Sequence, residues 1–331
     1  MLFLSAQDVL AALDCEAAMA SVAEAMRRQE AGQFEMPERT SIEGAAPDSC
    51  LLLMPCRTER SISTKLVSVF PSNAQRGLPL IDGIVSLFDA ETGQLRALLE
   101  GKTLTARRTG AVSGLAIRHL AAPDAKTLGL IGVGAQAVEQ LRHALAVRAL
   151  ERVMLYSRTR AESAAFAERF AEEAPGVEFE LAKDAGALLD QSEIVLTATT
   201  ARSPVLPDDP GRYRGKLCIA IGSFEAQVRE YPDAVFHDLE ACWVDTPHAI
   251  VESGELGLPL ASGALQAAQI RTLGSELLQA EVGERLEAPQ GPGERTRFFK
   301  SVGMGLFDLC VAEAAVAAAA QRGLGQTLGE A

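Results

Sequence analysis

The feature that most constrains the fold is a glycine turn between two short apolar runs. Residues 128–131 read as a buried strand, and the turn follows as Gly132-Val-Gly134-Ala-Gln-Ala137. An amphipathic segment then leads to a second apolar run at residues 153–156. Strand, glycine turn, helix and strand in this order are typical of a dinucleotide-binding unit. The alternative is a tight turn with only a structural role.

Each small residue of the turn has a physical reason to be small. Gly132 permits the sharp turn, and Gly134 has no Cβ, so a pyrophosphate can approach the backbone. Ala137 is small enough for close packing of the helix on the strand. The free N–H groups at the start of the helix then face the phosphates.

The end of the second strand indicates which dinucleotide binds. NAD-binding units usually place Asp or Glu there, to hold the ribose 2′-hydroxyl. Here the chain reads Ser157-Arg158-Thr159-Arg160, with no carboxylate before Glu162. Arg forms bidentate, charge-assisted bonds with phosphate, so the sequence favours NADP(H), with NAD(H) as the other possibility. The alternative is that Arg158 and Arg160 are solvated loop residues.

Composition excludes several classes of function. The 331 residues are 48% hydrophobic and carry a net charge of −13, which indicates about two globular domains and argues against nucleic acid or anionic membrane as partners. Six cysteines form no CxxC pair and no metal-like cluster with the four histidines, so we expect reduced thiols, no metal and a cytoplasmic protein. We see neither a signal peptide nor a run long enough to span a membrane.

The pattern along the chain predicts two domains of the α/β class. Helices over 5–31 and a β-meander lead to a helix over 104–120, which indicates an α+β domain. Alternating strands and helices then predict a Rossmann doubly wound parallel sheet. A final helix over 304–322 is expected to return to the first domain. The predicted strands are 49–55, 63–70, 83–89, 95–100, 128–131, 153–156, 177–181, 194–197 and 217–221, with 235–236 and 242–244 as further candidates.

Charged residues in apolar surroundings are the candidates for chemistry. Lys65 lies in a strand where apolar residues alternate. The alternative to a chemical role is a side chain that buries its stem and extends its ammonium group into water. Arg107 and Arg108 are adjacent in a helix of small residues, so they point in different directions and one should face inward. With Arg39, these cations equip an acidic protein to hold a small carboxylate. A further anion-friendly stretch, 300–303, precedes the final helix.

Several of these motifs occur in an order that resembles the ornithine cyclodeaminase/mu-crystallin family. They are Lys65-Leu-Val-Ser-Val-Phe-Pro-Ser-Asn73, Thr92-Gly93, Leu104-Thr-Ala-Arg-Arg-Thr-Gly-Ala111 and the glycine turn. The resemblance covers nearly the whole chain. It implies a homodimer, a Rossmann domain over 121–303, and a substrate-binding and dimerisation domain made of 1–120 together with 304–331.

The resemblance also implies roles for individual residues. Arg39 and Arg108 would grip the α-carboxylate of the substrate, and Lys65 would act as proton donor or polariser beside the reacting carbon and nitrogen. Residues of both domains would bind the cofactor: Thr109, Gly132, Gly134, Ala135, Gln136, Ser157, Arg158, Thr159, Thr197, Ala198, Thr199, Ser301, Val302 and Gly303.

One departure from the family pattern decides which activity we expect. The cyclodeaminases carry an aspartate for the distal amine, and here Phe224 stands in its place, with Glu225 one residue further on. Phe offers neither charge nor proton, so the sequence favours NAD(P)H-dependent reduction of small cyclic imino acids, pyrroline-2-carboxylate and piperideine-2-carboxylate. The alternatives are an ornithine or lysine cyclodeaminase, an open-chain amino-acid dehydrogenase of the alanine type, and an NADPH-binding protein with little catalysis.

Overall fold

The chain divides into two compact units. The computed structural model describes residues 1–281 and 295–329. One unit contains Met1–Ala111 and Gly303–Ala331, and the other contains Val112–Val302. We refer to them as unit 1 and unit 2. The division falls inside helix α3 (Gly101–Leu120), whereas the family resemblance implied that residues up to 120 belong to the first domain. None of the helices within the described residues has the length and apolar character needed to cross a membrane.

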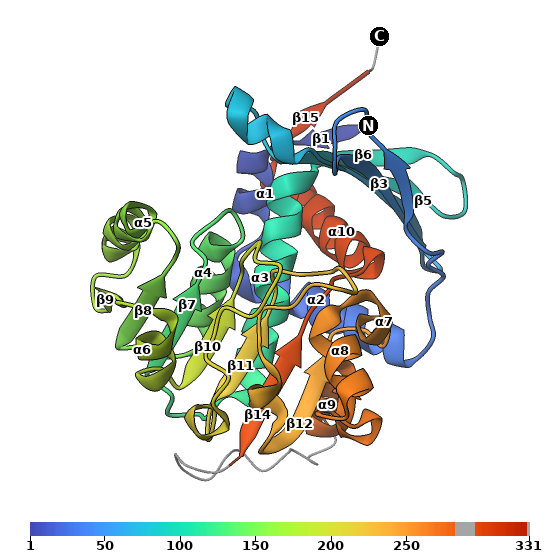
Figure 1. Ribbon diagram of the computed structural model, residues 1–331. Coiled ribbons are helices and arrows are strands. Elements are labelled where there is room, and N and C mark those ends of the chain that lie inside the picture. Colours follow the sequence, from blue (N-terminus) through green and yellow to red (C-terminus); the bar gives the residue numbers. More distant parts are fainter. Residues whose placement is uncertain (282–294, 330–331) are drawn as a thin grey trace. The chain divides into compact units, whose positions relative to one another are not determined.

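Unit 2 is built on an eight-stranded, fully parallel sheet of the Rossmann type (Figure 1). The strand order is β13-β12-β14-β11-β10-β7-β8-β9, so the sheet runs outward in both directions from β7. Ligands of doubly wound sheets bind outside the carboxyl ends of the strands where the order reverses. The strands are β7 (Thr127–Ile131), β8 (Arg152–Tyr156), β9 (Glu178–Leu181), β10 (Ile194–Thr197), β11 (Leu217–Ala220), β12 (Leu239–Val244), β13 (Ile270–Thr272) and β14 (Thr296–Lys300).

The sequence predicts helices over 138–149, 161–173 and 184–190 in unit 2, and the structure has the first three helices of this unit at these places. Beyond them, the expected strand at 235–236 is wrong, because these residues belong to the 3-10 helix η3, which starts directly after Pro232. The short helices that follow were not predicted. The helices are α4 (Ala137–Val147), α5 (Arg160–Glu173), α6 (Ala185–Asp190), α7 (Ala249–Glu252), α8 (Gly254–Ser262) and α9 (Leu273–Glu281), with 3-10 turns η2 (Pro210–Arg212), η3 (Asp233–Phe236) and η4 (Ala267–Gln269).

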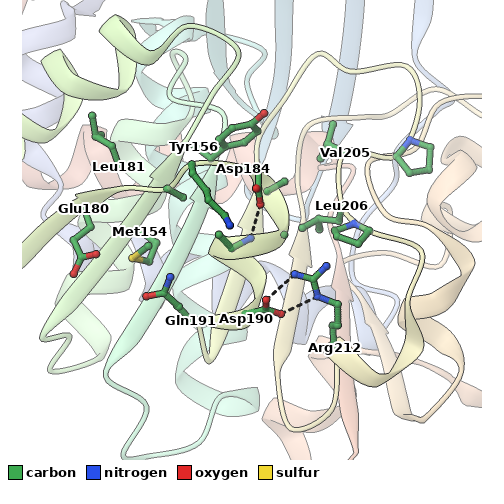
Figure 2. Close-up of a pocket in the computed structure, with 17 residues that line it drawn as sticks. Met154, Tyr156, Glu180, Leu181, Asp184, Asp190, Gln191, Val205, Leu206 and Arg212 are labelled. Carbon is green, nitrogen blue, oxygen red and sulfur yellow. Dashed lines mark hydrogen bonds and ion pairs between the residues drawn. The ribbon is translucent and has the colours of Figure 1, made fainter.

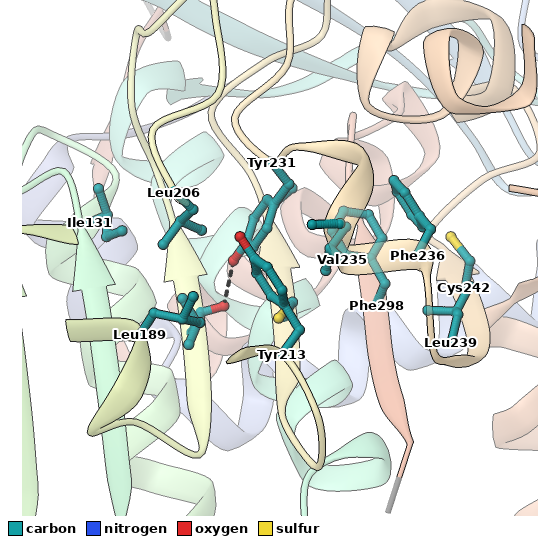
Figure 3. Close-up of a cluster of buried hydrophobic side chains, with 14 of the residues drawn as sticks. Ile131, Leu189, Leu206, Tyr213, Tyr231, Val235, Phe236, Leu239, Cys242 and Phe298 are labelled. Atoms are coloured by element: carbon teal, nitrogen blue, oxygen red, sulfur yellow. Dashed lines mark hydrogen bonds between the residues drawn. The ribbon is translucent and has the colours of Figure 1, made fainter. Parts of the chain in front are cut away.

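An aromatic cluster fixes the central strands of unit 2 (Figure 3). Tyr213 and Tyr231 are fully buried, and their hydroxyls donate to the carbonyls of Pro207 and Val195 at 2.6 and 2.8 Å. Phe298 of β14 meets Tyr231 edge to face, with ring centroids 5.2 Å apart. Such a pair contributes about 1 kcal/mol beyond the burial of its apolar area. The cluster therefore gives β10, β11 and β14 a rigid base.

Unit 1 is an antiparallel sheet packed on helices, and the predicted β-meander is confirmed as β3 to β6. The order is β15-β1-β6-β5-β4-β3-β2, and only the β1–β6 pair is parallel. Strands β1, β2 and β15 were not predicted. The elements are β1 (Leu2–Leu4), α1 (Ala6–Ala12), α2 (Cys15–Glu30), β2 (Thr40–Glu43), β3 (Cys50–Arg57), β4 (Ser61–Val69), η1 (Pro71–Arg76), β5 (Ile81–Asp89), β6 (Leu95–Glu100), α10 (Gly305–Arg322) and β15 (Gln326–Thr327).

Helix α10 returns to unit 1, as the sequence predicted, and packs against α2, β3 and β4 (Figure 1). It covers one face of the sheet, where Met54 of β3, Lys65 of β4 and Val85 of β5 are cross-strand neighbours and all buried. The opposite face leaves apolar side chains exposed, including Ile42 and Leu51. The covered face is therefore the core of unit 1, and it includes a lysine.

Candidate functional site

The charged centre of unit 1 is an ion pair between Lys65 and Asp308. Lys65 projects from β4 and Asp308 from the first turn of α10, and the distance between Nζ and Oδ2 is 2.7 Å. The side chains are only 3% and 0% exposed, so this is not a snorkelling lysine. A buried charge is costly unless it is paired. The strand and the helix thus bring together two side chains that each need the other.

Arg108 completes a triad on the same carboxylate. Its Nε donates to Oδ1 of Asp308 at 3.1 Å, and its side chain is 7% exposed. Gly303 has φ +74°, and a Cβ at this position would lie 2.2 Å from Nη1 of Arg108. The backbone of Gly303 therefore leaves the space that the guanidinium occupies. Gly303 was predicted to bind the cofactor, whereas in the structure it lies against Arg108, a candidate substrate-binding residue.

Burial, modified by the neighbouring charges, sets the pKa of Lys65. Burial lowers this pKa from 10.5 to about 8, Asp308 opposes the change, and Arg108 and Arg39 add to it. Burial would raise the pKa of Asp308, but Lys65 and Arg108 outweigh it and hold the pKa below its usual range. The centre therefore holds two cations and one carboxylate in a buried place, with an ammonium group whose pKa is close to neutrality.

The other predicted residues of unit 1 are placed as follows. Arg39 is half-buried on the segment before β2, close enough to act on the pKa of Lys65. Arg107 is as buried as Arg108, and its Nη1 donates to Sγ of Cys15 at 3.6 Å, so both arginines face inward rather than one. Thr109 is buried, and its hydroxyl donates to the carbonyl of Thr105 within α3 at 2.7 Å.

Sequence reasoning missed Asp308. The only signal was a lone acidic residue among apolar ones in the run Gly305-Leu-Phe-Asp-Leu-Cys-Val-Ala312. Its partners precede it by most of the chain, so no local pattern connects them. The sequence indicated the cations of this centre but not the carboxylate that joins them.

The glycine turn of unit 2 has the shape that a phosphate site requires. Gly132 has φ +89°, and a Cβ there would lie 2.6 Å from the carbonyl oxygen of Ala198, so a larger residue does not fit. At Gly134 an added Cβ would meet nothing within 4 Å, which leaves the backbone open to approach. Ala137 is fully buried at the start of α4. The two glycines therefore differ as predicted, one fixing the turn and the other keeping it accessible.

The start of α4 offers unused polar groups. No side chain caps this helix at Gln136, whereas Ser5, Asp14 and Asp184 cap α1, α2 and α6. Oε1 of Gln136 is buried without a hydrogen-bond partner. The first N–H groups of a helix attract anions. The turn and the neighbouring Ala135, which is exposed, fit a dinucleotide pyrophosphate.

The residues after β8 form a small loop that contains no carboxylate. The hydroxyl of Ser157 donates to the carbonyl of Thr159 at 2.9 Å and lies 2.8 Å from the hydroxyl of Ser163. Arg158 and Arg160 are exposed. Ser157 thus shapes the loop, and Arg158 stands at its surface.

The loops after β10 and β14 involve carboxylates that sequence reasoning also missed. Thr197 is fully buried, and the N–H of Thr199 donates to Oε1 of Glu230 at 2.7 Å. Ser301 donates through Oγ to Asp245 Oδ2 at 2.6 Å, and the N–H of Val302 donates to the same carboxylate. These residues lie at the carboxyl ends of parallel strands, where doubly wound sheets bind ligands.

Phe224 lies in the loop after β11 with a side chain that is 46% exposed. Glu225 is also exposed, and its carboxylate forms an ion pair with Arg202 at 3.4 Å. The two residues therefore offer an accessible apolar ring and a solvated carboxylate.

A pocket of about 1090 Å³ lies elsewhere in unit 2, between β8, β9, α6 and the segment 204–207 (Figure 2). None of the predicted cofactor residues lines it. Three of its charged residues already have partners within unit 2, since Arg212 binds Asp190 at 2.7 and 2.8 Å and Asp184 caps α6. We assign no chemistry to this pocket.

Comparison with known proteins decides the family. The model of the ornithine cyclodeaminase/mu-crystallin family matches residues 1–321. The chain belongs to the ornithine cyclodeaminase/mu-crystallin family. Its relatives in this family include a Delta(1)-pyrroline-2-carboxylate reductase of Bacillus cereus, 34% identical over 99% of both chains. A Delta(1)-pyrroline-2-carboxylate/Delta(1)-piperideine-2-carboxylate reductase of Azospirillum brasilense is 31% identical over 97% of this chain and 96% of the relative.

A solved structure has the same fold as this chain. The Thermococcus litoralis Delta(1)-pyrroline-2-carboxylate reductase, solved in complex with NADH and L-proline, is 30% identical, with a TM-score of 0.89 over 99% of this chain and all of that chain. Its fold agrees with the Rossmann sheet and the second unit described above.

Proposed function

We propose that the chain is an NAD(P)H-dependent reductase that converts small cyclic imino acids, pyrroline-2-carboxylate and piperideine-2-carboxylate, to L-proline and L-pipecolate. The observation that carries the proposal is the Lys65–Asp308–Arg108 triad, because it combines a carboxylate-binding cation with a proton donor of suitable pKa. The relatives named for this reaction match the chain over nearly its full length.

Arg108 and Arg39 hold the substrate carboxylate in this mechanism. Arg108 uses Nε for Asp308, and a guanidinium has five N–H donors in a fork, so its terminal nitrogens remain suited to a second carboxylate. Arg39, half-buried nearby, supplies the second positive charge. Two fixed contacts orient the imine carbon, which is catalysis by positioning.

Lys65 supplies the proton. A bound reduced nicotinamide would supply the hydride to the imine carbon, and the imine nitrogen must gain a proton in the same reaction. Lys65, with a pKa of about 8, is mostly protonated at neutral pH and is acidic enough to give the proton up. Asp308 orients the ammonium group and stabilises its charged form before transfer. The lysine then regains a proton from water.

The dinucleotide binds at the glycine turn in this proposal, and NADPH is preferred over NADH. Gly132, Gly134, Ala135 and Gln136 hold the pyrophosphate, for which the open Gly134 and the uncapped α4 are suited. Arg158, flanked by Ser157 and Thr159, is suited to a 2′-phosphate, and no carboxylate stands there to bind the 2′-hydroxyl of NAD.

The partner in this proposal is a second copy of the chain. The outer face of the sheet in unit 1 carries Ile42, Leu51 and Ile84, which are 52%, 36% and 38% exposed. Ile42 pairs with Leu51 across β2 and β3, so they lie on the same face. An exposed apolar face of a sheet is typical of a dimer interface.

We also place the protein in the cytoplasm. The six cysteines form no disulfide bonds with one another. Burial raises the pKa of the Cys56, Cys218 and Cys310 thiols to about 12, so these thiols are unreactive.

The test is an assay of nicotinamide oxidation with purified protein. We expect absorbance of NADPH to fall rapidly with either cyclic imino acid, and no ammonia to be released from ornithine. Ammonia release without a net change in cofactor would instead indicate a cyclodeaminase. Oxidation of NADPH that requires free ammonia and an open-chain keto acid would indicate a dehydrogenase. Cofactor binding without any turnover would indicate a binding protein.

A further inference from the structure

Glu230 joins two loops that leave neighbouring strands of the parallel sheet. Its side chain is fully buried, and its carboxylate accepts two backbone hydrogen bonds. The N–H of Thr199, after β10, donates to Oε1 at 2.7 Å, and the N–H of Gly222, after β11, donates to Oε2 at 2.8 Å. One carboxylate therefore sets the spacing of two loops at the carboxyl edge of the sheet.

The same loops touch each other and the glycine turn. A Cβ on Gly222 would lie 2.2 Å from the carbonyl oxygen of Thr199 and 2.6 Å from Oε1 of Glu230. On the other side, a Cβ on Gly132 would lie 2.6 Å from the carbonyl oxygen of Ala198. The turn after β7, the loop after β10 and the loop after β11 thus form one continuous row.

A second buried carboxylate holds Glu230 itself. Glu255, 1% exposed, accepts the N–H of Glu230 at 2.9 Å and the N–H of Tyr231 at 2.7 Å. Lys300 is a buried cation in this region, and its Nζ donates to the carbonyl of Ser223. Burial lowers the pKa of Lys300, and Glu255 and Glu230 oppose that change. Glu255 therefore holds the backbone of Glu230, and the side chain of Glu230 in turn holds the two loops.

We infer that Glu230 is a positioning residue for the nicotinamide half of the dinucleotide. This inference rests on the proposed function. In a doubly wound sheet the adenosine ribose lies beside the strand that follows the glycine-turn helix, here β8, and the dinucleotide crosses the switch point. The other half then extends over the loops after β10 and β11, which Glu230 holds in register.

The decisive variant is Glu230→Gln, because the amide places an NH₂ group against one of the two backbone N–H donors. Loss of a charge-assisted bond at this place should raise the Kd for NADPH about tenfold. ADP, which lacks the nicotinamide half, should bind the variant as it binds the wild type. Titration of both nucleotides by calorimetry separates the two effects.

Glu193→Gln is the matched control. The carboxylate of Glu193 also accepts two backbone N–H groups, those of Lys126 and Thr127 at 2.8 and 3.0 Å, but at the amino ends of β7 and β10. Its loss should lower thermal stability and leave the Kd for NADPH unchanged.

The outcomes distinguish this inference from the function on which it rests. If the wild type binds neither NADPH nor NADH, the proposed function fails. If it binds NADPH and Glu230→Gln binds equally well, or loses ADP as strongly as NADPH, the positioning role is refuted. Should Glu230→Gln not fold, Glu255→Gln is measured instead, and it must weaken NADPH binding in the same selective way for the inference to stand.

Discussion

Nζ of Lys65 and Oδ2 of Asp308 lie 2.7 Å apart in the core of unit 1, although Lys65 is on β4 and Asp308 on the last helix, α10. Neither charge is stable there alone, because burial without a partner costs several kcal/mol. Arg108 pairs with the same carboxylate, so the two cations and one carboxylate leave a net charge of one positive unit. That surplus is what an anionic substrate would bind.

Replacing the carboxylate of Asp308 tests whether the two cations depend on it. In Asp308→Asn, two buried cations lose their counter-charge, so we expect the pKa of Lys65 to fall below about 8 and turnover at neutral pH to drop about a hundredfold. Breaking a buried pair should also lower the free energy of unfolding by about 3 kcal/mol. Steady-state kinetics and chemical denaturation measure the two effects. Glu313→Gln, on the same helix and bonded to Ser61 at 2.6 Å, is the control and should keep its activity.

The pH dependence of activity and of stability should run in opposite directions for Lys65. As a proton donor it must be charged, so kcat should fall as the pH rises through about 8. Its folded pKa lies below the value of 10.5 in the unfolded chain, so the unfolded chain binds more protons between these values. Its contribution to stability should therefore increase as the pH rises from about 8 to 10.5.

The comparison that isolates this effect is Lys65→Met. The difference in unfolding free energy between wild type and variant should change with pH in that window, and the variant should lose imine reduction by at least about a hundredfold. A variant that reduces the imine at nearly the wild-type rate would show that Lys65 is not the proton donor.

Gly303→Ala should disturb the substrate site through Arg108. The added Cβ meets Nη1 of Arg108 at 2.2 Å, so the guanidinium must move, and we expect KM for the imino acid to rise about tenfold. Gly323→Ala provides the control, since Gly323 has φ +66° and open space around its Cβ position. Both variants suffer backbone strain, so equal effects on KM would mean that strain alone is responsible.

Cofactor preference should depend on Arg158. We expect Arg158→Ala to raise KM for NADPH about tenfold and to leave KM for NADH unchanged, because only NADPH carries the 2′-phosphate. Arg169→Ala, an exposed arginine on α5, is the control. A wild-type enzyme that prefers NADH, or an Arg158→Ala variant with unchanged preference, would contradict this assignment.

Association through the outer face of the sheet is tested with Leu51→Lys. We expect light scattering to give a dimer for the wild type and a monomer for the variant, since a charge in an apolar interface remains unpaired. Val251→Lys, at a side chain that is 70% exposed on α7, should remain dimeric. A monomeric wild type would rule out the interface.

Local patterns accounted for most of the fold. The sequence predicted β7, the glycine turn, α4 and β8 because strand, turn and helix follow one another without a gap. It missed β14, although this strand is fully buried between β11 and β12. The run Thr296-Arg-Phe-Phe-Lys300 reads as polar, and only the structure shows that Arg297 is matched by Glu240 at 2.7 and 2.8 Å.

The sequence predicted those site residues that are recognisable from their neighbours in the chain, and missed those that act on distant segments. Lys65 and Arg108 were visible as cations in apolar surroundings, and the family resemblance supplied their roles. Asp308 and Glu230 act on residues that come from other elements, so neither has a signature in its own neighbourhood. A carboxylate that works by joining distant segments becomes recognisable only when the segments are folded together.

The return of α10 to unit 1 has a consequence for the order in which the protein matures. During synthesis the strands of unit 1 emerge first, but the helix that covers their inner face emerges only after all of unit 2. Until then Lys65 has no Asp308, and its sheet lacks a lid of apolar side chains. The nascent chain therefore carries an unfinished first unit while the second one folds, and the same late helix that completes the core also delivers the counter-ion of its lysine.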